Sequence, residues 1–215
     1  MVSQDVEWGR VNIVDAERRL LANALLDADN QRFVLVSEAC IPLWNFTFVY
    51  HYLMDTNISY LAAFDDPGPH GRGRYNWNMR PEIEIDQWRK GAQWFEFTRK
   101  VSRDVVADTK FYPKFLWFCL PSCYADEHYF PTMLTTIDGE QLANRSITSA
   151  DWGGGGAHPK SFVNVEMKKE TIIHMRGEPT CEWNGIPDQP CFLFGRKLEP
   201  STRARLMVLA RFMGF

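Results

Sequence analysis

The sequence predicts an α/β fold, because segments with helical periodicity alternate with short apolar runs of strand length. Residues 14–28 carry apolar side chains at helical spacing opposite Arg and Glu, which is typical of an amphipathic helix. Residues 32–36 follow as a continuous apolar run, which is typical of a buried parallel strand. In such folds the ligand-binding loops follow the carboxyl ends of the strands, so functional residues are expected there.

The remaining elements continue this alternation, and turn or capping residues bound them. In chain order they are a helix over 46–54 capped by Asn45, a strand over 60–64, a long loop over 65–81, a strand over 93–97, a helix capped by Thr98 and ending near 106, a helix over 126–135 that Pro131 bends or interrupts, a loop over 153–156, a strand over 191–195, and a final helix capped by Ser201 and ending at 212.

The composition places the chain among globular proteins. Its 215 residues predict one domain, or at most two small ones, and we take residues 1–215 as a single domain. The 45% hydrophobic and 24% charged residues exclude a disordered or collagen-like chain. A net charge of −3 disfavours a dedicated nucleic-acid binder. Aromatic residues reach 14%, which suits either core packing or flat platforms for sugars and bases.

The sequence supports two interpretations of the cellular compartment. No apolar run is long enough to span a bilayer, and the first residues lack the pattern of a signal peptide, which by themselves predict a soluble protein that is not secreted. Against this, three N-glycosylation sequons begin at Asn45, Asn57 and Asn144. The cysteines add to the second interpretation, because two close pairs and one odd thiol suit an oxidising lumen.

The cysteine pattern leaves two interpretations open. Cys119 lies close to Cys123, and Cys181 to Cys191, with Cys40 alone. The first interpretation is two disulfides, of which Cys181–Cys191 would close a short loop across a turn. The second is a metal site made by the first pair together with Cys181, which lacks the usual Cys-x2-Cys or His-x3-His partner.

Familiar catalytic motifs are absent from the sequence. No Gly-rich dinucleotide or phosphate-binding loop opens a helix, and no Gly-x-Ser-x-Gly nucleophile motif occurs. Instead, Asp126, Glu127 and His128 form a run of ionisable groups. This run could supply a general base, or it could be an ordinary acidic helix start favoured by the helix dipole.

Two charged clusters lie in the long loop. Arg72, Arg74 and Arg80 could bind an anionic or hydroxyl-rich ligand, or they could be solvated. Asp65 and Asp66 could hold a divalent metal, although the following Pro-Gly makes a capped turn the stronger interpretation. A third cluster, Arg176 with Arg196 and Lys197, could neutralise a diphosphate or be surface charge.

Seven collinear segments resemble one known family, the core 2/I-branching β-1,6-N-acetylglucosaminyltransferases, in its plant-type branch. The segments are residues 14–26, 33–43, 64–75, 88–95, 121–129, 151–152 with 158–159, and 191–197. The resemblance implies a GT-A-like mixed sheet flanked by helices, in a Golgi type II membrane protein with a luminal catalytic domain. It also implies inverting transfer of a sugar, typically N-acetylglucosamine, from a UDP-sugar to a glycan or glycoprotein acceptor. It implies no metal cofactor and no nucleic-acid partner.

Site residues are carried over from this resemblance by position. Glu127 matches the catalytic base, and Arg176 and Lys197 match the basic pair that holds the UDP diphosphate, with Arg196 beside them. Trp152 matches an aromatic residue that packs against the acceptor sugar. Three residues of the long loop fall on the acceptor side: Arg72, Arg74 and Tyr75.

One departure from the family limits these expectations. Members of the family begin with a membrane anchor, a stem and the first βα units of the nucleotide-binding half, and this chain starts near the helix of residues 14–28. We therefore expect an N-terminally truncated domain that lacks those units and does not turn over by itself. The alternative function is a catalytically inactive fragment of this fold that binds carbohydrate or a partner.

Overall fold

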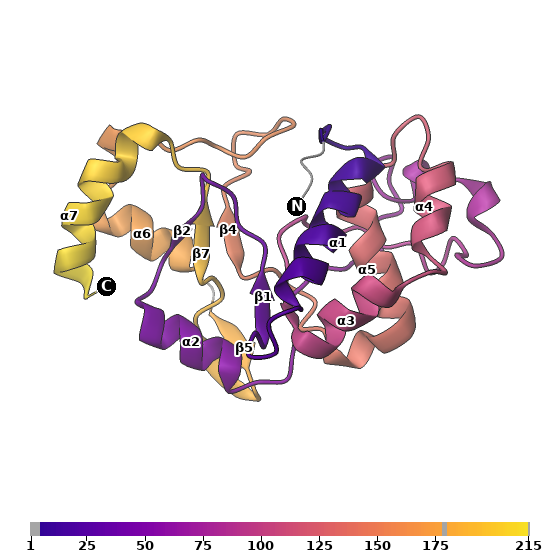
Figure 1. Cartoon of the computed structure of the whole chain (residues 1–215). Coiled ribbons are helices and arrows are strands. Elements are labelled where there is room, and N and C mark those ends of the chain that lie inside the picture. Colours follow the sequence, from indigo (N-terminus) through magenta and orange to yellow (C-terminus); the bar gives the residue numbers. More distant parts are fainter. Residues whose placement is uncertain (1–4, 178–179, 215) are drawn as a thin grey trace. The chain divides into compact units, whose positions relative to one another are not determined.

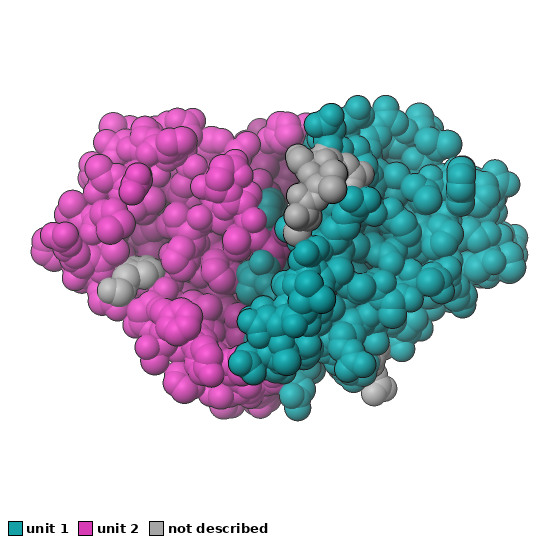
Figure 2. Space-filling view, viewed as in Figure 1, with its two compact units in different colours: residues 1–34, 57–145 teal, residues 35–56, 146–215 magenta. Residues whose placement is uncertain are grey.

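The computed structural model describes residues 5–177 and 180–214 (Figure 1). The chain divides into two compact units, each made from two separate stretches of sequence (Figure 2). Unit 1 comprises residues 1–34 and 57–145, and unit 2 comprises residues 35–56 and 146–215. The sequence-based expectation of a single domain over residues 1–215 stays a prediction.

Unit 1 is mainly helical. Its helices are α1 (Val11–Ala24), α3 (Arg99–Ala107), α4 (Tyr112–Phe118) and α5 (Ala125–Asp138), and its strands are β1 (Arg32–Val34) and β3 (Glu96–Thr98). α1 packs against α3 and α5. Large aromatic side chains fill the core, because burying each removes a large apolar area from water. They include Trp88, Phe97, Phe115, Tyr129 and Phe130, all less than 2% exposed.

The strand pairing in unit 1 corrects two sequence-based predictions. β1 was expected to be parallel, yet it pairs antiparallel with β3, with Phe33 opposite Phe97. A continuous apolar run fits either pairing, since it reports burial on both faces and not direction. The strand expected over residues 60–64 is absent from the described structure. Tyr60 and Phe64 each form one isolated bridge, to Glu96 and Lys90 respectively.

Unit 2 contains a mixed three-stranded sheet in the order β2-β7-β4. β2 (Ile41–Pro42) pairs antiparallel and β4 (Thr148–Ala150) pairs parallel with the central β7 (Phe194–Arg196). A separate hairpin joins β5 (Cys181–Trp183) to β6 (Ile186–Gln189). The helices of this unit are α2 (Phe46–Met54), α6 (Lys169–Arg176) and α7 (Arg203–Met213).

The predicted α/β class is confirmed, and this mixed architecture is consistent with a GT-A-like glycosyltransferase fold. Short 3-10 helices punctuate the loops: η1 (Arg72–Arg74), η2 (Trp77–Met79), η3 (Gly139–Gln141), η4 (Asn164–Glu166) and η5 (Pro200–Thr202). Within the part of the chain that the structure describes, no helix is both long and apolar enough to cross a membrane.

Two of the three predicted helix caps are confirmed. Asn45 Oδ1 accepts the Phe48 N–H at 2.8 Å, and Thr98 Oγ1 accepts the Val101 N–H at 3.3 Å. The cap predicted at Ser201 is wrong, because Ser201 lies inside η5 and α7 begins only at Arg203. Local side-chain caps are readable from sequence, whereas the extra 3-10 turn before α7 is not.

Both cysteine pairs form disulfides, Cys119–Cys123 and Cys181–Cys191, and Cys40 is a free thiol. The predicted pairing is confirmed. The metal interpretation of Cys119, Cys123 and Cys181 is wrong, because a disulfide sulfur has no thiolate left to bind a metal. Among the described residues, no group of three or more His, Cys, Asp or Glu side chains could hold a metal ion.

Candidate active site

The candidate base, Glu127, lies in the first turn of α5 in unit 1. Its side chain is 27% exposed, so the carboxylate is reachable from solvent while much of the side chain is packed. Acidic residues are favoured at this position because the helix dipole places partial positive charge there. The helix predicted over residues 126–135 is confirmed as part of α5. The position of Glu127 in the first turn of this helix sets where its carboxylate lies.

Two cations hold the Glu127 carboxylate. Lys90 Nζ lies 2.6 Å from Glu127 Oε2, and Arg74 Nη1 lies 3.3 Å from the same oxygen. Both cationic side chains are about one-fifth exposed, so these contacts are partly shielded from water. Charge-assisted hydrogen bonds of this kind are shorter and stronger than neutral ones, so the carboxylate is oriented as well as charge-balanced.

A proline in α5 explains why Lys90 lies beside Glu127. Pro131 has no N–H, so the carbonyl of Glu127, four residues earlier, lacks its helical partner. The Gly91 N–H donates to that carbonyl at 2.8 Å instead. Residue 91 must be glycine for this approach, because a Cβ there would lie 1.9 Å from the Ala62 carbonyl oxygen. The interruption of α5 that Pro131 predicted is not seen, since the helix continues to Asp138.

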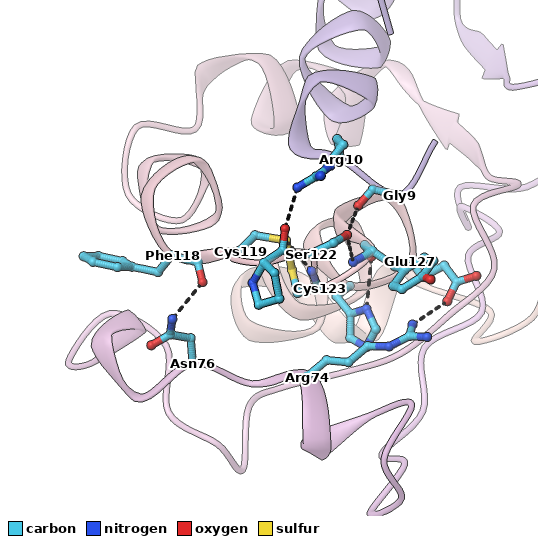
Figure 3. Close-up of a disulfide and its surroundings, with 12 residues drawn as sticks. Gly9, Arg10, Arg74, Asn76, Phe118, Cys119, Ser122, Cys123 and Glu127 are labelled. Carbon is cyan, nitrogen blue, oxygen red and sulfur yellow. Dashed lines mark hydrogen bonds and ion pairs between the residues drawn. A yellow bond between two sulfur atoms is a disulfide. The ribbon is translucent and has the colours of Figure 1, made fainter. Parts of the chain in front are cut away.

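The residue that precedes α5 is strained. Tyr124 adopts a left-handed conformation with φ of 54°, which is rare for a bulky side chain. Two contacts of its ring help to hold it there: the Arg74 guanidinium lies 3.8 Å from the ring centroid, and the Trp8 ring centroid lies 5.1 Å away in an edge-on arrangement. The Cys119–Cys123 disulfide immediately precedes it (Figure 3). Arg74 thus contacts both the strained residue and Glu127.

The neighbours of Glu127 in the Asp-Glu-His run are buried. Asp126 is 3% exposed and His128 is fully buried, stacked on Trp88 at 4.8 Å between ring centroids. Burial and the adjacent Glu127 charge raise the pKa of Asp126 to about 6, and burial lowers the pKa of His128 to about 4. His128 Nδ1 lies 3.1 Å from the Tyr124 carbonyl, which assigns the proton to that nitrogen. Only Glu127 of the three is placed to meet a substrate.

A second buried carboxyl is that of Glu17 on α1, the helix that packs against α5. Glu17 is 4% exposed, and Glu17 Oε1 accepts a hydrogen bond from Gln93 Nε2 at 2.8 Å. Burial raises the pKa of Glu17 to about 8, with a further contribution from the Asp126 charge. Glu17 therefore keeps its proton at neutral pH, which lowers the cost of burying it.

The acceptor-side residues of the long loop have different surroundings. Arg72 forms a bidentate pair with Asp65, with hydrogen bonds of 2.8 and 2.6 Å. Asp66 Oδ1 accepts the Gly68 N–H at 2.8 Å, which is the capped turn that the sequence favoured. Tyr75 is 9% exposed and its hydroxyl donates to the Ile83 carbonyl at 2.6 Å. Its ring therefore lies in the core of unit 1, and its assignment to the acceptor side stays a prediction.

In unit 2, Trp152 and Arg196 line one pocket. β4 and β7 pair in parallel with Ala150 opposite Arg196, and Trp152 follows the end of β4 with 52% of its surface exposed. The pocket measures about 220 Å³ and His174 also lines it. Burial lowers the pKa of Arg196, and the nearby Cys40 and Glu38 oppose that shift. An aromatic face and a cation thus share this pocket.

Lys197 lines a different and larger pocket of unit 2, of about 670 Å³. Glu38, Arg203 and the apolar side chains of Leu206 and Met207 also line it. Arg176 belongs to neither pocket's lining. Its Nε donates to the Leu43 carbonyl at 2.9 Å, and its guanidinium lies 3.8 Å from the Trp44 ring centroid. The three candidate diphosphate ligands therefore do not share either of these two pockets.

Comparison with known proteins adds to this geometry. The family model of the Core-2/I-Branching enzymes matches residues 1–176, which include Glu127, Arg74 and Trp152. The chain belongs to this family. A rice protein (Oryza sativa subsp. japonica) named Glycosyltransferase BC10 is 35% identical over 250 residues. That alignment covers 97% of this chain and 62% of the relative, so the chain spans less than two thirds of the relative's length.

The surroundings of Glu127 in this Core-2/I-Branching chain include two residues that the sequence did not predict. Lys90 is the nearest cation to Glu127, and Glu17 is the buried carboxyl behind it. Lys90 lies in a segment that resembles the family, but a lysine in a loop has no distinguishing pattern. The sequence signal is indirect: Pro131 leaves the Glu127 carbonyl without a helical partner, so another donor can approach it.

Proposed function

We propose that this chain carries the catalytic part of an inverting glycosyltransferase that moves a sugar from a UDP-sugar to a hydroxyl of an acceptor glycan. Family membership supports glycosyl transfer as the general activity. The observation that carries the proposal is the Glu127 carboxylate, reachable at the start of α5 and oriented by Lys90 and Arg74. N-acetylglucosamine is the donor sugar to test first, because the resembling family typically transfers it.

In the proposed step, Glu127 accepts the proton of the acceptor hydroxyl as its oxygen attacks the anomeric carbon. The bond from that carbon to the diphosphate oxygen breaks on the opposite side, so the configuration inverts. General-base catalysis of this kind contributes roughly 10²–10⁴-fold to a rate. Two fixed cations keep the carboxylate aimed, so little reorganisation is needed during the reaction.

The leaving UDP carries negative charge that must be neutralised. We assign this to Lys197, Arg196 and Arg176 of unit 2, in place of a divalent metal. The exposed Trp152 ring is suited to stack against a sugar. Arg196 lines the same pocket and is suited to bind an anionic or hydroxyl group. In unit 1, Arg74 and Arg72 are assigned to the acceptor side, with Tyr75 supporting them from the core.

The proposed setting is the Golgi lumen, in a plant glycosyltransferase held by a membrane anchor in its full-length form. Two disulfides support a luminal environment, because such bonds persist in oxidising compartments and are rare in the cytosol. The proposed partners are the UDP-sugar donor and a glycan or glycoprotein acceptor.

The test is donor and acceptor screening with Glu127→Gln, in this chain and in a form extended at its N-terminus. The variant should reduce transfer by at least about 10²-fold, while calorimetry still detects UDP binding. Glu84→Gln is the matched control, because Glu84 forms an exposed surface pair with Arg80. Full turnover by Glu127→Gln would reject the role of Glu127.

Two further outcomes separate alternatives. Transfer that persists in EDTA supports the metal-free proposal, whereas loss in EDTA with recovery by Mn²⁺ would contradict it. Glycan binding without UDP binding or transfer, in both the short and the extended form, would favour the inactive binding fragment.

A further inference from the structure

Asn45 starts an exposed sequon at the N-terminus of α2. Asn45, Phe46 and Thr47 match the Asn-x-Thr acceptor pattern, and all three side chains are exposed. We propose that Asn45 carries an N-linked glycan whose first sugars cover the aromatic rings of Phe46 and Tyr50. This modification does not depend on the proposed activity of the chain.

The local geometry of Asn45 tolerates a glycan. Its Oδ1 is the helix cap and accepts the Phe48 N–H, and this oxygen is not the atom that is modified. The reacting atom, Nδ2, donates to the Gly214 carbonyl at 3.2 Å. A carboxamide nitrogen carries two hydrogens, so one of them can be replaced while the nitrogen keeps an N–H donor. The helix cap and the glycan are therefore compatible.

The chemistry requires a lipid diphosphate-linked oligosaccharide as the donor. A bond forms between Asn45 Nδ2 and the anomeric carbon of the first sugar. The bond from that carbon to the diphosphate oxygen breaks, the lipid diphosphate leaves, and Nδ2 loses one proton to solvent. The two disulfides support the proposed luminal setting, on which this inference rests, because they persist in the oxidising type of compartment where this reaction takes place.

The aromatic surface beside Asn45 indicates what the sugars contact. Phe46 is 80% exposed and Tyr50 is 47% exposed, and their ring centroids lie 5.9 Å apart on one face of α2. Exposed aromatic rings in contact with each other form an apolar surface, and covering that surface with another group removes it from water. The apolar faces of sugar rings stack on aromatic rings, and a glycan on the adjacent residue starts within reach.

The other two sequons differ in structure. Asn144 has a left-handed backbone, unlike Asn45, although its Oδ1 likewise accepts a backbone N–H, that of Ala63 at 2.7 Å. In the sequon of Asn57 the Ser59 hydroxyl is buried and accepts the Thr98 N–H at 2.9 Å. The middle residues, Ile58 and Arg145, are partly buried and present no exposed aromatic ring. Asn45 therefore combines an exposed sequon with an aromatic surface for the sugars.

The test expresses the chain in a eukaryotic secretory host and maps glycopeptides before and after peptide N-glycosidase treatment. The Asn45 peptide should carry a glycan in the chain without substitutions and in the Phe46→Ala variant. It should lose the glycan in Asn45→Asp, which keeps a capping oxygen, and in Thr47→Ala, which keeps Asn45 itself. An unmodified Asn45 peptide in folded, secreted protein would overturn the proposal.

A second measurement tests the stacking. Enzymatic removal of the glycan should lower the Tm of the protein without substitutions by about 2–4 °C. It should leave the Tm of the Phe46→Ala variant nearly unchanged. Equal shifts in both proteins would show that the glycan is present without covering the ring, and would overturn that part of the proposal. Thr47→Ala, treated in parallel, controls for the enzyme treatment.

Discussion

Lys90 Nζ contacts Glu127 Oε2 at 2.6 Å, and the next residue, Gly91, donates its N–H to the Glu127 carbonyl. One short segment thus holds both the side chain and the backbone of the candidate base. The contact is made within unit 1, between a loop and the first turn of α5.

Replacing Lys90 by Met removes the cation while keeping much of the aliphatic volume. The Glu127 carboxylate then has only Arg74 to orient it, at the longer distance of 3.3 Å. We expect kcat to fall by about 10²-fold, because misplacing a catalytic group by about 1 Å costs that much. The KM for the donor should change little. Lys90→Arg should recover part of kcat, and an unchanged kcat in Lys90→Met would contradict the positioning role.

Replacing Gly91 by Ala tests the backbone half of the same contact. The added Cβ would lie 1.9 Å from the Ala62 carbonyl oxygen, so residues 90–91 must shift. We expect loss of transfer together with lower thermal stability. Gly139→Ala is the matched control, because a Cβ there meets nothing within 4 Å. Activity assays with melting curves for both variants check this, and equal behaviour of the two would disprove it.

Glu17 should make stability depend on pH. Its pKa is about 8 in the folded chain and near 4.5 when unfolded, so the folded state holds a proton that the unfolded state releases. This contribution is complete below about pH 4.5 and is lost as pH rises towards 8, with a slope of at most about 1.4 kcal/mol per pH unit.

Urea unfolding of the unmodified chain and of Glu17→Gln at several pH values isolates this effect. The introduced side-chain amide would keep an oxygen for the Gln93 hydrogen bond but cannot ionise. The free energy of unfolding of the variant should therefore rise relative to the unmodified chain between pH 5 and 8. Asp126 and His128 also titrate with shifted pKa values, but both are common to the two proteins. Parallel pH profiles would exclude the assignment.

The buried pair of Arg32 and Glu96 joins β1 to β3. Arg32 Nε lies 3.2 Å from Glu96 Oε1, with side chains 9% and 0% exposed. Burial raises the pKa of Glu96 to about 8 and the Arg32 charge opposes that rise, so Glu96 is mainly ionised only above about pH 8. At such a pH, Arg32→Met leaves a buried carboxylate unpaired, which should lower the free energy of unfolding measured in urea by about 3–5 kcal/mol. The double variant Arg32→Met/Glu96→Met should recover much of that loss, because no charge is left unpaired. A double variant as unstable as the single one would show that packing, not charge, dominates there.

Features set by neighbouring residues could be predicted from the sequence. The Asn45 and Thr98 caps depend on N–H groups three residues away, and the two disulfides join cysteines that are close in the chain. The alternation of elements likewise predicted the mixed α/β class. These are short-range relationships, and local propensity largely determines them.

Features set by distant residues could not be predicted. The partner of β1 lies more than 60 residues later, and the apolar pattern carries no direction. Arg176 is held by the Leu43 carbonyl and the Trp44 ring, far away in the chain. Tyr75 looked like a loop residue, yet its ring is packed against Trp88. The Glu127 surroundings depend on Lys90, 37 residues earlier, for which no local rule exists.

The segment that precedes α1 packs against the turn that precedes α5, although more than 110 residues separate them. Arg10 donates to the Pro121 carbonyl, Ser122 donates to the Gly9 carbonyl, and Trp8 packs on Tyr124. Trimming the chain after residue 10 would therefore leave every candidate catalytic side chain in place and still loosen the turn that aims Glu127. Fragment boundaries chosen only to keep those side chains would remove the contacts that hold this turn.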